Sequence, residues 1–251
     1  MRNYLTRVAL LLGLAASIGC ATTVEKGSRM PGKGAATGFL NKTMAVDGHE
    51  RRYVVYVPSD YTPKKTWPLI LFLHGAGERG DDGLIQTEVG IGRAIRRHTD
   101  RFPCIVVMPQ CPRTVWWDKA FVDMETALSQ TEEEYAIDPK RVYLTGLSLG
   151  GFGTWMYGAL HADRFAALMP ICGGGDPADA EKLARIPIWA FHGADDQTVP
   201  PAKSEEMADA IRKANGNVQC TVIPNTGHNS WDAAYDNPET IKWLLEQRSK
   251  R

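Results

Sequence analysis

The stretch that most constrains the fold of this 251-residue chain is Val142-Tyr-Leu-Thr-Gly-Leu-Ser148-Leu-Gly-Gly-Phe-Gly-Thr154. A short apolar strand, a Gly-x-Ser-x-Gly turn and a helix that begins with small residues follow one another, which is the pattern of a nucleophile elbow. Such a turn strains the serine backbone and exposes its hydroxyl at the edge of a sheet. Gly146 and Gly150 leave room where a Cβ would press against the neighbouring strand or helix. Because the helix directs its N-terminal amides at the same point, Ser148 is the candidate nucleophile.

Apolar runs and helical stretches alternate along the rest of the chain. Leu69–Leu73 and Ile105–Met108 are continuously apolar, as strands buried on both faces should be. Asp47-Gly48 separates two further runs and predicts a tight hairpin turn. Eight strands are expected, at residues 43–46, 51–57, 69–73, 105–108, 142–145, 167–172, 186–192 and 218–223, with helices near 91–97, 121–135, 151–160, 201–214 and 238–247. This alternation predicts an α/β fold, with a mostly parallel eight-stranded sheet, helices on both faces and an antiparallel first pair of strands.

Residues 43–251 are expected to form one domain, because the length suits one α/β domain and no internal repeat or interdomain linker is found. Only about fourteen residues, 173–186, join the sixth and seventh expected strands. That connection is too short for a large cap domain, so the sequence predicts an open site.

Ligands bind at the carboxyl ends of the strands in sheets of this kind. His74-Gly75-Ala76-Gly77 follows the strand at 69–73 and is of the type whose backbone N–H stabilises an oxyanion. We assign that donor to Ala76 and the second donor to Leu149, the residue after the nucleophile. One such hydrogen bond contributes about 3 kcal/mol in a transition state. His74 itself is interpreted as a structural residue of the loop.

Candidates for an acid and a base follow the last two strands. Asp195 and Asp196 follow the seventh strand, and His228 lies in the loop after the eighth. Along the chain, the candidate nucleophile, acid and base therefore occur in the order Ser, Asp, His. His228 would take the Ser148 proton, while an aspartate fixes the tautomer of the imidazole and stabilises its charged form.

These motifs together carry a family resemblance. The segments that carry the resemblance are Leu73-His-Gly-Ala-Gly-Glu-Arg-Gly80, Pro109-Gln-Cys-Pro112 and Ile137-Asp-Pro-Lys-Arg-Val-Tyr-Leu-Thr-Gly-Leu-Ser148. From about residue 46 to residue 245 the chain resembles secreted bacterial esterases of the α/β-hydrolase superfamily. The branch is the one shared by feruloyl and acetyl-xylan esterases, polyhydroxybutyrate depolymerases and prolyl-oligopeptidase-like hydrolases.

The resemblance implies an α/β-hydrolase fold and a serine carboxylesterase that works through an acyl-enzyme, without a metal or an organic cofactor. The hydrolases that the chain resembles carry the motif His-Gly-x-x-Asp-x-x-Val-Pro, which implies that Asp196 is the acid. Asp195 then braces the loop or faces solvent. The implied substrates are feruloyl or acetyl esters of plant polysaccharide, or similar short or aromatic acyl esters. Two alternatives stay open: a serine peptidase of the prolyl-oligopeptidase type, and a surface lipoprotein that binds a partner and has lost catalysis.

Three tryptophans are candidate substrate-binding residues. Trp116 and Trp117 follow the fourth strand, and Trp231 follows His228. Their aromatic faces could stack on a sugar or on an aromatic acyl group. The alternative for each of them is a place in the core.

The first twenty residues read as a signal peptide. Arg2 and Arg7 precede an apolar stretch, residues 8–18, that is too short to span a bilayer. The stretch ends at Cys20, which resembles the lipidated cysteine of a bacterial lipoprotein, and ordinary secretory cleavage is the alternative. Residues 21–42 are then a flexible tether. The expected location is the periplasm or the cell surface, with the membrane reached only through the lipid anchor.

Charge and cysteine spacing exclude other classes of function. Lys+Arg and Asp+Glu balance at 29 each, so nothing in the charge favours a nucleic-acid partner. No group of Cys and His residues has zinc-ligand spacing, so no metal is expected. Cys172 and Cys220 fall on strands with a third strand between them, about 9.6 Å apart and beyond disulfide reach. Cys104 and Cys111 flank an extended segment, and buried free thiols are expected.

Overall fold

An eight-stranded sheet in the order β1-β2-β4-β3-β5-β6-β7-β8 runs through residues 35–249, which are the residues that the computed structural model describes. The strands are β1 (Gly38–Val46), β2 (His49–Val57), β3 (Trp67–Leu73), β4 (Ile105–Pro109), β5 (Ile137–Leu147), β6 (Ala167–Ile171), β7 (Ile188–Gly193) and β8 (Val218–Ile223). β2 pairs antiparallel with both β1 and β4, and β3 to β8 are parallel. The predicted fold class is therefore confirmed.

The hairpin of β1 and β2 has the expected turn and an earlier start. Asp47 and Gly48 both have positive φ, 50° and 77°, as a two-residue turn between right-twisted strands requires. β1 begins at Gly38, so residues 38–42, which the sequence assigns to the tether, belong to the sheet. The reason is pairing and packing: Leu40 lies opposite Val55 in the ladder and packs against the core.

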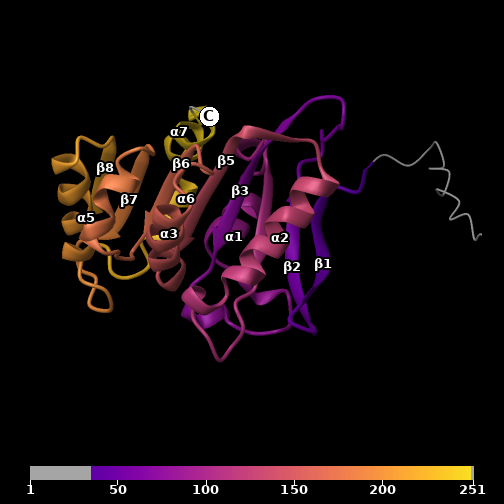
Figure 1. Cartoon of the computed structure of the whole chain (residues 1–251), viewed down its shortest axis with the longest axis horizontal. Helices are drawn as coiled ribbons and strands as arrows, with labels where there is room; N and C mark the ends of the chain where they lie inside the picture. The colour runs from indigo at the N-terminus through magenta and orange to yellow at the C-terminus, as the bar shows by residue number, and fades with distance from the viewer. Residues whose placement is uncertain (1–34, 250–251) are drawn as a thin grey trace, which may run out of the picture. The chain divides into compact units, whose positions relative to one another are not determined.

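Helices cover both faces of the sheet, and the sheet separates the core into two clusters of buried side chains (Figure 1). The first core packs under α2 (Phe121–Glu134), α3 (Leu149–Leu160), α4 (Ala180–Leu183) and α5 (Ala202–Lys213). The second packs under α1 (Gly90–Arg97), α6 (Trp231–Asp236) and α7 (Pro238–Glu246), and α6 is a helix that the sequence did not predict. Between β6 and β7 the described chain forms only a 3-10 turn and α4, so no cap domain lies there. None of the helices in residues 35–249 is long and apolar enough to cross a bilayer.

The turn between β5 and α3 is strained and tightly packed. Ser148 has φ 52° and ψ −115°, a conformation that costs a non-glycine residue on the order of 1–3 kcal/mol. A Cβ on Gly146 would lie 2.3 Å from the Gly150 carbonyl oxygen, and a Cβ on Gly150 would lie 1.9 Å from the Leu73 carbonyl oxygen. β3, the turn and α3 can therefore approach this closely only with glycine at both positions, as the sequence predicts.

We expect Gly150→Ala to lower the free energy of unfolding by at least about 3 kcal/mol, because a methyl group there overlaps the backbone of Leu73 and no side chain can yield. Gly77→Ala is the matched control, since its Cβ meets nothing within 4 Å and the change should stay within about 0.5 kcal/mol. Urea denaturation of both variants measures the difference. Equal midpoints for the two variants would show that the close approach of β3 and α3 is wrong.

Candidate active site

The carboxyl ends of β5, β7 and β8 bring three polar side chains together at one edge of the sheet. Ser148 follows β5 directly and is the N-cap residue of α3, where the helix directs its positive end. Its N–H donates to the Ile171 carbonyl at 2.9 Å and lies 3.3 Å from the Cys172 thiol. Its carbonyl accepts the N–H of Phe152 at 3.0 Å. With the backbone held at both ends, the side chain of Ser148 is presented to the site in a fixed direction.

Asp196 follows β7 in a loop whose backbone turns around its carboxyl group. One carboxylate oxygen, Oδ1, accepts the N–H groups of Thr198 at 2.8 Å and Val199 at 2.9 Å. Burial of Asp196 disfavours its charged form, but these bonds and the one from His228 outweigh burial and hold the pKa of the carboxyl below its usual value. Asp195, by contrast, is exposed. The structure thus places Asp196 in the site and Asp195 outside it.

His228 joins the other two residues. Its Nδ1 lies 2.7 Å from Asp196 Oδ2, and its Nε2 lies 2.9 Å from Ser148 Oγ. Because an ionised carboxylate only accepts hydrogen bonds, Nδ1 carries the proton and Nε2 is free to accept the serine hydroxyl. The arrangement can therefore remove a proton from Ser148 and hold the resulting charge on the imidazole.

A second buried histidine contacts the same carboxylate. His192 Nε2 lies 3.2 Å from Asp196 Oδ2 and 2.9 Å from the Val199 carbonyl, and both of these atoms are acceptors, so this nitrogen carries a proton. His192 Nδ1 lies 2.7 Å from the Ser204 hydroxyl. Asp196 is thus held between two histidines. His192 was not among the predicted site residues, although its place four residues before Asp196 was a usable signal.

The loop after β3 lies against the serine turn. A Cβ on Gly75 would lie 3.7 Å from Ser148 Cβ, which places the loop beside the candidate nucleophile. Within residues 35–249, neither the N–H of Ala76 nor that of Leu149 donates to another protein atom. Both residues begin a helical turn, where the first N–H groups have no partner within the helix. Two donors are therefore available to an oxyanion.

His74 is a structural residue, as expected. Its Nε2 accepts the N–H of Cys111 at 2.9 Å, and its Nδ1 lies 2.6 Å from the Gly75 carbonyl, so a neutral ring satisfies both. Burial lowers the pKa of His74 to about 4, which keeps the ring uncharged at neutral pH. The ring ties the ends of β3 and β4 together and takes no part in the Ser148–His228–Asp196 chain.

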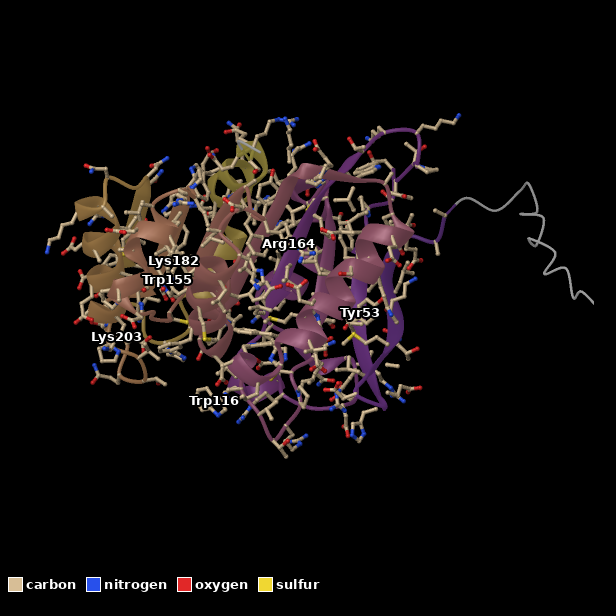
Figure 2. The ribbon with its side chains drawn as sticks, in the orientation of Figure 1. Tyr53, Trp116, Trp155, Arg164, Lys182 and Lys203 are labelled. Atoms are coloured by element: carbon tan, nitrogen blue, oxygen red, sulfur yellow. The ribbon has the colours of Figure 1, made fainter. Side chains whose placement is uncertain are left out.

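The three tryptophans occupy different positions. Trp117 is 1 % exposed and packs in the core, where its indole N–H donates to the His74 carbonyl at 3.0 Å, although the residue also lines a hollow beside α3. Trp116 is 57 % exposed at the rim, where Figure 2 labels it. Trp231 is partly buried, and its ring stands at 90° to that of His228 with centroids 5.5 Å apart. Trp231 therefore supports the imidazole from the side.

The described cysteines are free, as predicted, but one of them is less buried than the sequence predicts. All four cysteines in residues 35–249 are free, and three are buried. Cys220 is only partly buried, because β8 is the edge strand of the sheet. Within these residues no cluster of three His, Cys, Asp or Glu side chains could hold a metal ion. Cys20 and the predicted signal peptide lie outside the described residues.

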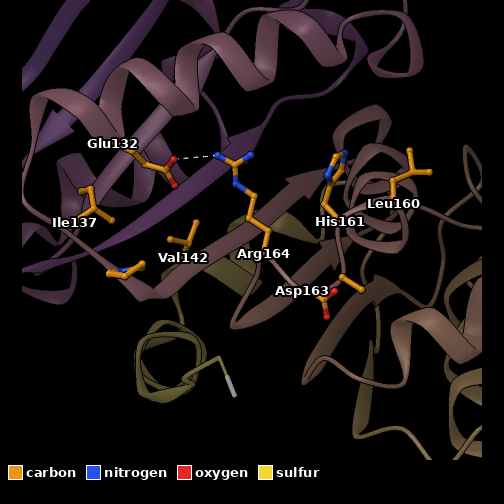
Figure 3. A pocket seen from close by; sticks show the side chains of 9 residues that line it. Glu132, Ile137, Val142, Leu160, His161, Asp163 and Arg164 are labelled. Carbon is orange, nitrogen blue, oxygen red and sulfur yellow. Dashed lines mark hydrogen bonds and ion pairs between the residues drawn. The ribbon is translucent and has the colours of Figure 1, made fainter. Parts of the chain in front are cut away.

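A large hollow of about 730 Å³ lies elsewhere, beside the start of β5 and the end of α3 (Figure 3). Glu132 and Arg164 form an ion pair across it at 3.0 Å, and Ile137, Leu160 and His161 line it. None of Ser148, Asp196 and His228 lies in its wall. The hollow is therefore separate from the candidate active site.

Comparison with known proteins finds similar chains among esterases. A probable feruloyl esterase C of Aspergillus niger is 24 % identical over 84 % of this chain and 78 % of its own length. A bifunctional acetylxylan esterase/xylanase, XynS20E of Neocallimastix patriciarum, is 31 % identical, but the match covers 64 % of this chain and 23 % of that protein. The crystal structure of a thermostable esterase has a TM-score of 0.77 and 36 % identity, covering 84 % of this chain and 63 % of that one.

The match to XynS20E and the match to the thermostable esterase each span less than two thirds of the other protein. A family model supplies the assignment, because residues 53–238 match that of the dienelactone hydrolase family. The eight-stranded, mostly parallel sheet agrees with the match. The chain belongs to the dienelactone hydrolase family.

Proposed function

We propose that this protein is a serine ester hydrolase that works through an acyl-enzyme. The observation that carries the proposal is the continuous hydrogen-bonded chain from Ser148 through His228 to Asp196, with the serine held in a strained turn. A partly buried chain of this kind serves no evident packing purpose, since it brings the buried Asp196 carboxylate to the edge of the core. Its geometry matches what activation of a serine hydroxyl requires.

The reaction proceeds in two halves. Nε2 of His228 takes the hydroxyl proton as Ser148 Oγ bonds to the ester carbonyl carbon, and the oxyanion accepts hydrogen bonds from the N–H groups of Ala76 and Leu149. His228 then gives its proton to the departing alcohol oxygen as the carbon–oxygen bond breaks. In the second half, water repeats these steps on the acyl-enzyme and releases the acid. Asp196 holds the imidazole in one tautomer and stabilises its charged form throughout.

Carboxylic esters are the substrate class that the comparisons support. The relatives reported above are named as feruloyl and acetylxylan esterases, so we propose feruloyl, acetyl or similar short or aromatic acyl esters for this chain. A peptidase of the prolyl-oligopeptidase type is the second candidate, since an acylaminoacyl peptidase shares the fold with a TM-score of 0.62 at 12 % identity.

A substrate panel separates these candidates. The purified protein should hydrolyse nitrophenyl acetate, nitrophenyl butyrate, methyl ferulate or acetylated xylan and leave a proline-containing peptide amide intact. Cleavage of the amide at a rate comparable to the esters would favour the peptidase. Turnover of none of the esters would contradict the proposed function, and turnover of neither the esters nor the amide would leave a protein that binds a partner without catalysis as the remaining alternative.

A further inference from the structure

An apolar groove of about 560 Å³ lies directly beside Ser148. One wall is a face of α3 that carries Leu149, Phe152 and Met156, spaced three and four residues apart as one helix face requires. The other wall is the loop after β4, which contributes Val115 and Trp116. Leu149 is the residue whose N–H we assign to the oxyanion hole, so the groove begins where the ester carbonyl would lie.

The groove and His228 lie on opposite sides of Ser148. Leu149 belongs to the core on the α2 and α3 face of the sheet, and Leu147, two residues earlier, belongs to the core on the α1 and α6 face. Trp231, which packs edge to face against His228, lies against that second core. Ser148 therefore stands between the two faces, with the imidazole toward one and the groove toward the other.

This placement decides which part of an ester the groove receives. The departing alcohol oxygen must face His228, because that residue gives it a proton. The carbonyl oxygen faces Ala76 and Leu149. The remaining substituent on the carbonyl carbon is the acyl group, and the direction left to it leads along α3 into the groove.

The walls of the groove favour a flat apolar group. Trp116 is 57 % exposed and Phe152 is 36 % exposed, so both present ring surface to solvent. Trp116 is nevertheless held in place: the Arg79 guanidinium donates to the Val115 carbonyl at 3.2 Å and lies 5.7 Å from the Trp116 ring centroid. The charged side chains of the groove, Asp118 and Lys119, pair with each other at 3.3 Å. Ring surface held in this way gains stability when another ring covers it.

We propose that this groove is the acyl site and that it selects aromatic acyl groups of the cinnamoyl type over acetyl. The inference rests on the proposed function and goes further, since it assigns the acyl and alcohol sides of the ester to different faces of the sheet. It makes Trp116 and Phe152 residues that determine acyl specificity. The alcohol part of the ester lies on the His228 side and does not contact these two rings.

Two substrate pairs test the assignment. The acyl pair is nitrophenyl cinnamate and nitrophenyl acetate, and the alcohol pair is benzyl acetate and methyl acetate. In Trp116→Ala and in Phe152→Ala the ratio of kcat/KM for cinnamate over acetate should fall about tenfold, while the ratio for benzyl over methyl acetate stays constant. Trp116→Phe keeps a ring and should restore most of the cinnamate preference. Leu160→Ala, 57 % exposed at the other end of α3, is the control and should change neither ratio.

The outcomes are distinct. A change in the benzyl-to-methyl ratio instead of the cinnamate-to-acetate ratio would place the alcohol in the groove and overturn the proposal. Unchanged ratios in both alanine variants would also overturn it, because the rings would then contact neither part of the ester. Wild-type turnover of nitrophenyl acetate shows that the proposed function holds in either case, and its absence would remove the proposed function together with the acyl site.

Discussion

Replacement of Ser148 by alanine is expected to lower kcat/KM for an ester by on the order of 10⁴- to 10⁶-fold. The reason is that Ser148 Oγ is the atom that His228 Nε2 contacts, at 2.9 Å, and no other described hydroxyl lies in the Ser148–His228–Asp196 chain. What remains after the change is the contribution of the oxyanion donors and of substrate binding. The rate of nitrophenyl acetate hydrolysis, with protein concentration set by absorbance, measures the loss.

Ser59→Ala is the control for this experiment, because Ser59 is exposed in the loop between β2 and β3 and should give wild-type rates. Thermal unfolding of both variants checks that the fold is intact. A Ser148→Ala protein that is folded and retains more than about a hundredth of the wild-type rate would contradict the assignment of the nucleophile, since removal of any one member of such a triad costs far more.

Asp196→Asn is expected to lower kcat by on the order of 10⁴-fold, whereas Asp195→Asn should leave it unchanged. The two residues are neighbours in the chain, but only Asp196 reaches His228, at 2.7 Å. An amide in its place offers a neutral partner that can donate to Nδ1, which favours the tautomer with the proton on Nε2 and blocks that nitrogen from accepting the Ser148 proton. Asp195 is exposed, and its substitution leaves these hydrogen bonds in place.

The pH dependence of the two variants adds a second readout. In wild type the low pKa of Asp196 keeps the carboxylate charged well into acid, so the acid limb of the rate profile belongs to another group. In Asp196→Asn a faster rate at high pH, where hydroxide can act in place of the base, would fit the wrong-tautomer explanation. Similar rates for Asp195→Asn and Asp196→Asn would contradict the choice between the two aspartates.

Much of the fold can be predicted from the sequence because each of these elements has a local sequence pattern. β3 and β4 are buried on both faces, and their sequences are continuous apolar runs for that reason. The turn at Ser148 is readable because backbone groups approach Gly150 so closely that no other residue fits. The hairpin turn is readable because Asp47 and Gly48 both need positive φ.

Other features depend on partners that are distant in the sequence. Trp116 and Trp117 are identical neighbours without a periodic pattern, and only tertiary contacts distinguish them: Trp117 packs in the core and donates its indole N–H to the His74 carbonyl. Residues 38–42 resemble a tether by composition, and their pairing with β2 makes them a strand. The groove beside Ser148 could not be predicted, because it forms between the loop after β4 and a face of α3 that meet only in the folded chain.

The most direct test of the account is covalent labelling of the intact protein with a fluorophosphonate, followed by peptide mass spectrometry. Such probes react with a serine hydroxyl that a neighbouring base has activated. The account predicts one adduct per chain, on the peptide that contains Ser148, formed in wild type and Asp195→Asn and absent from Ser148→Ala. An adduct on a different serine, or no adduct on folded wild-type protein, would contradict the claim that Ser148, His228 and Asp196 form an active catalytic site.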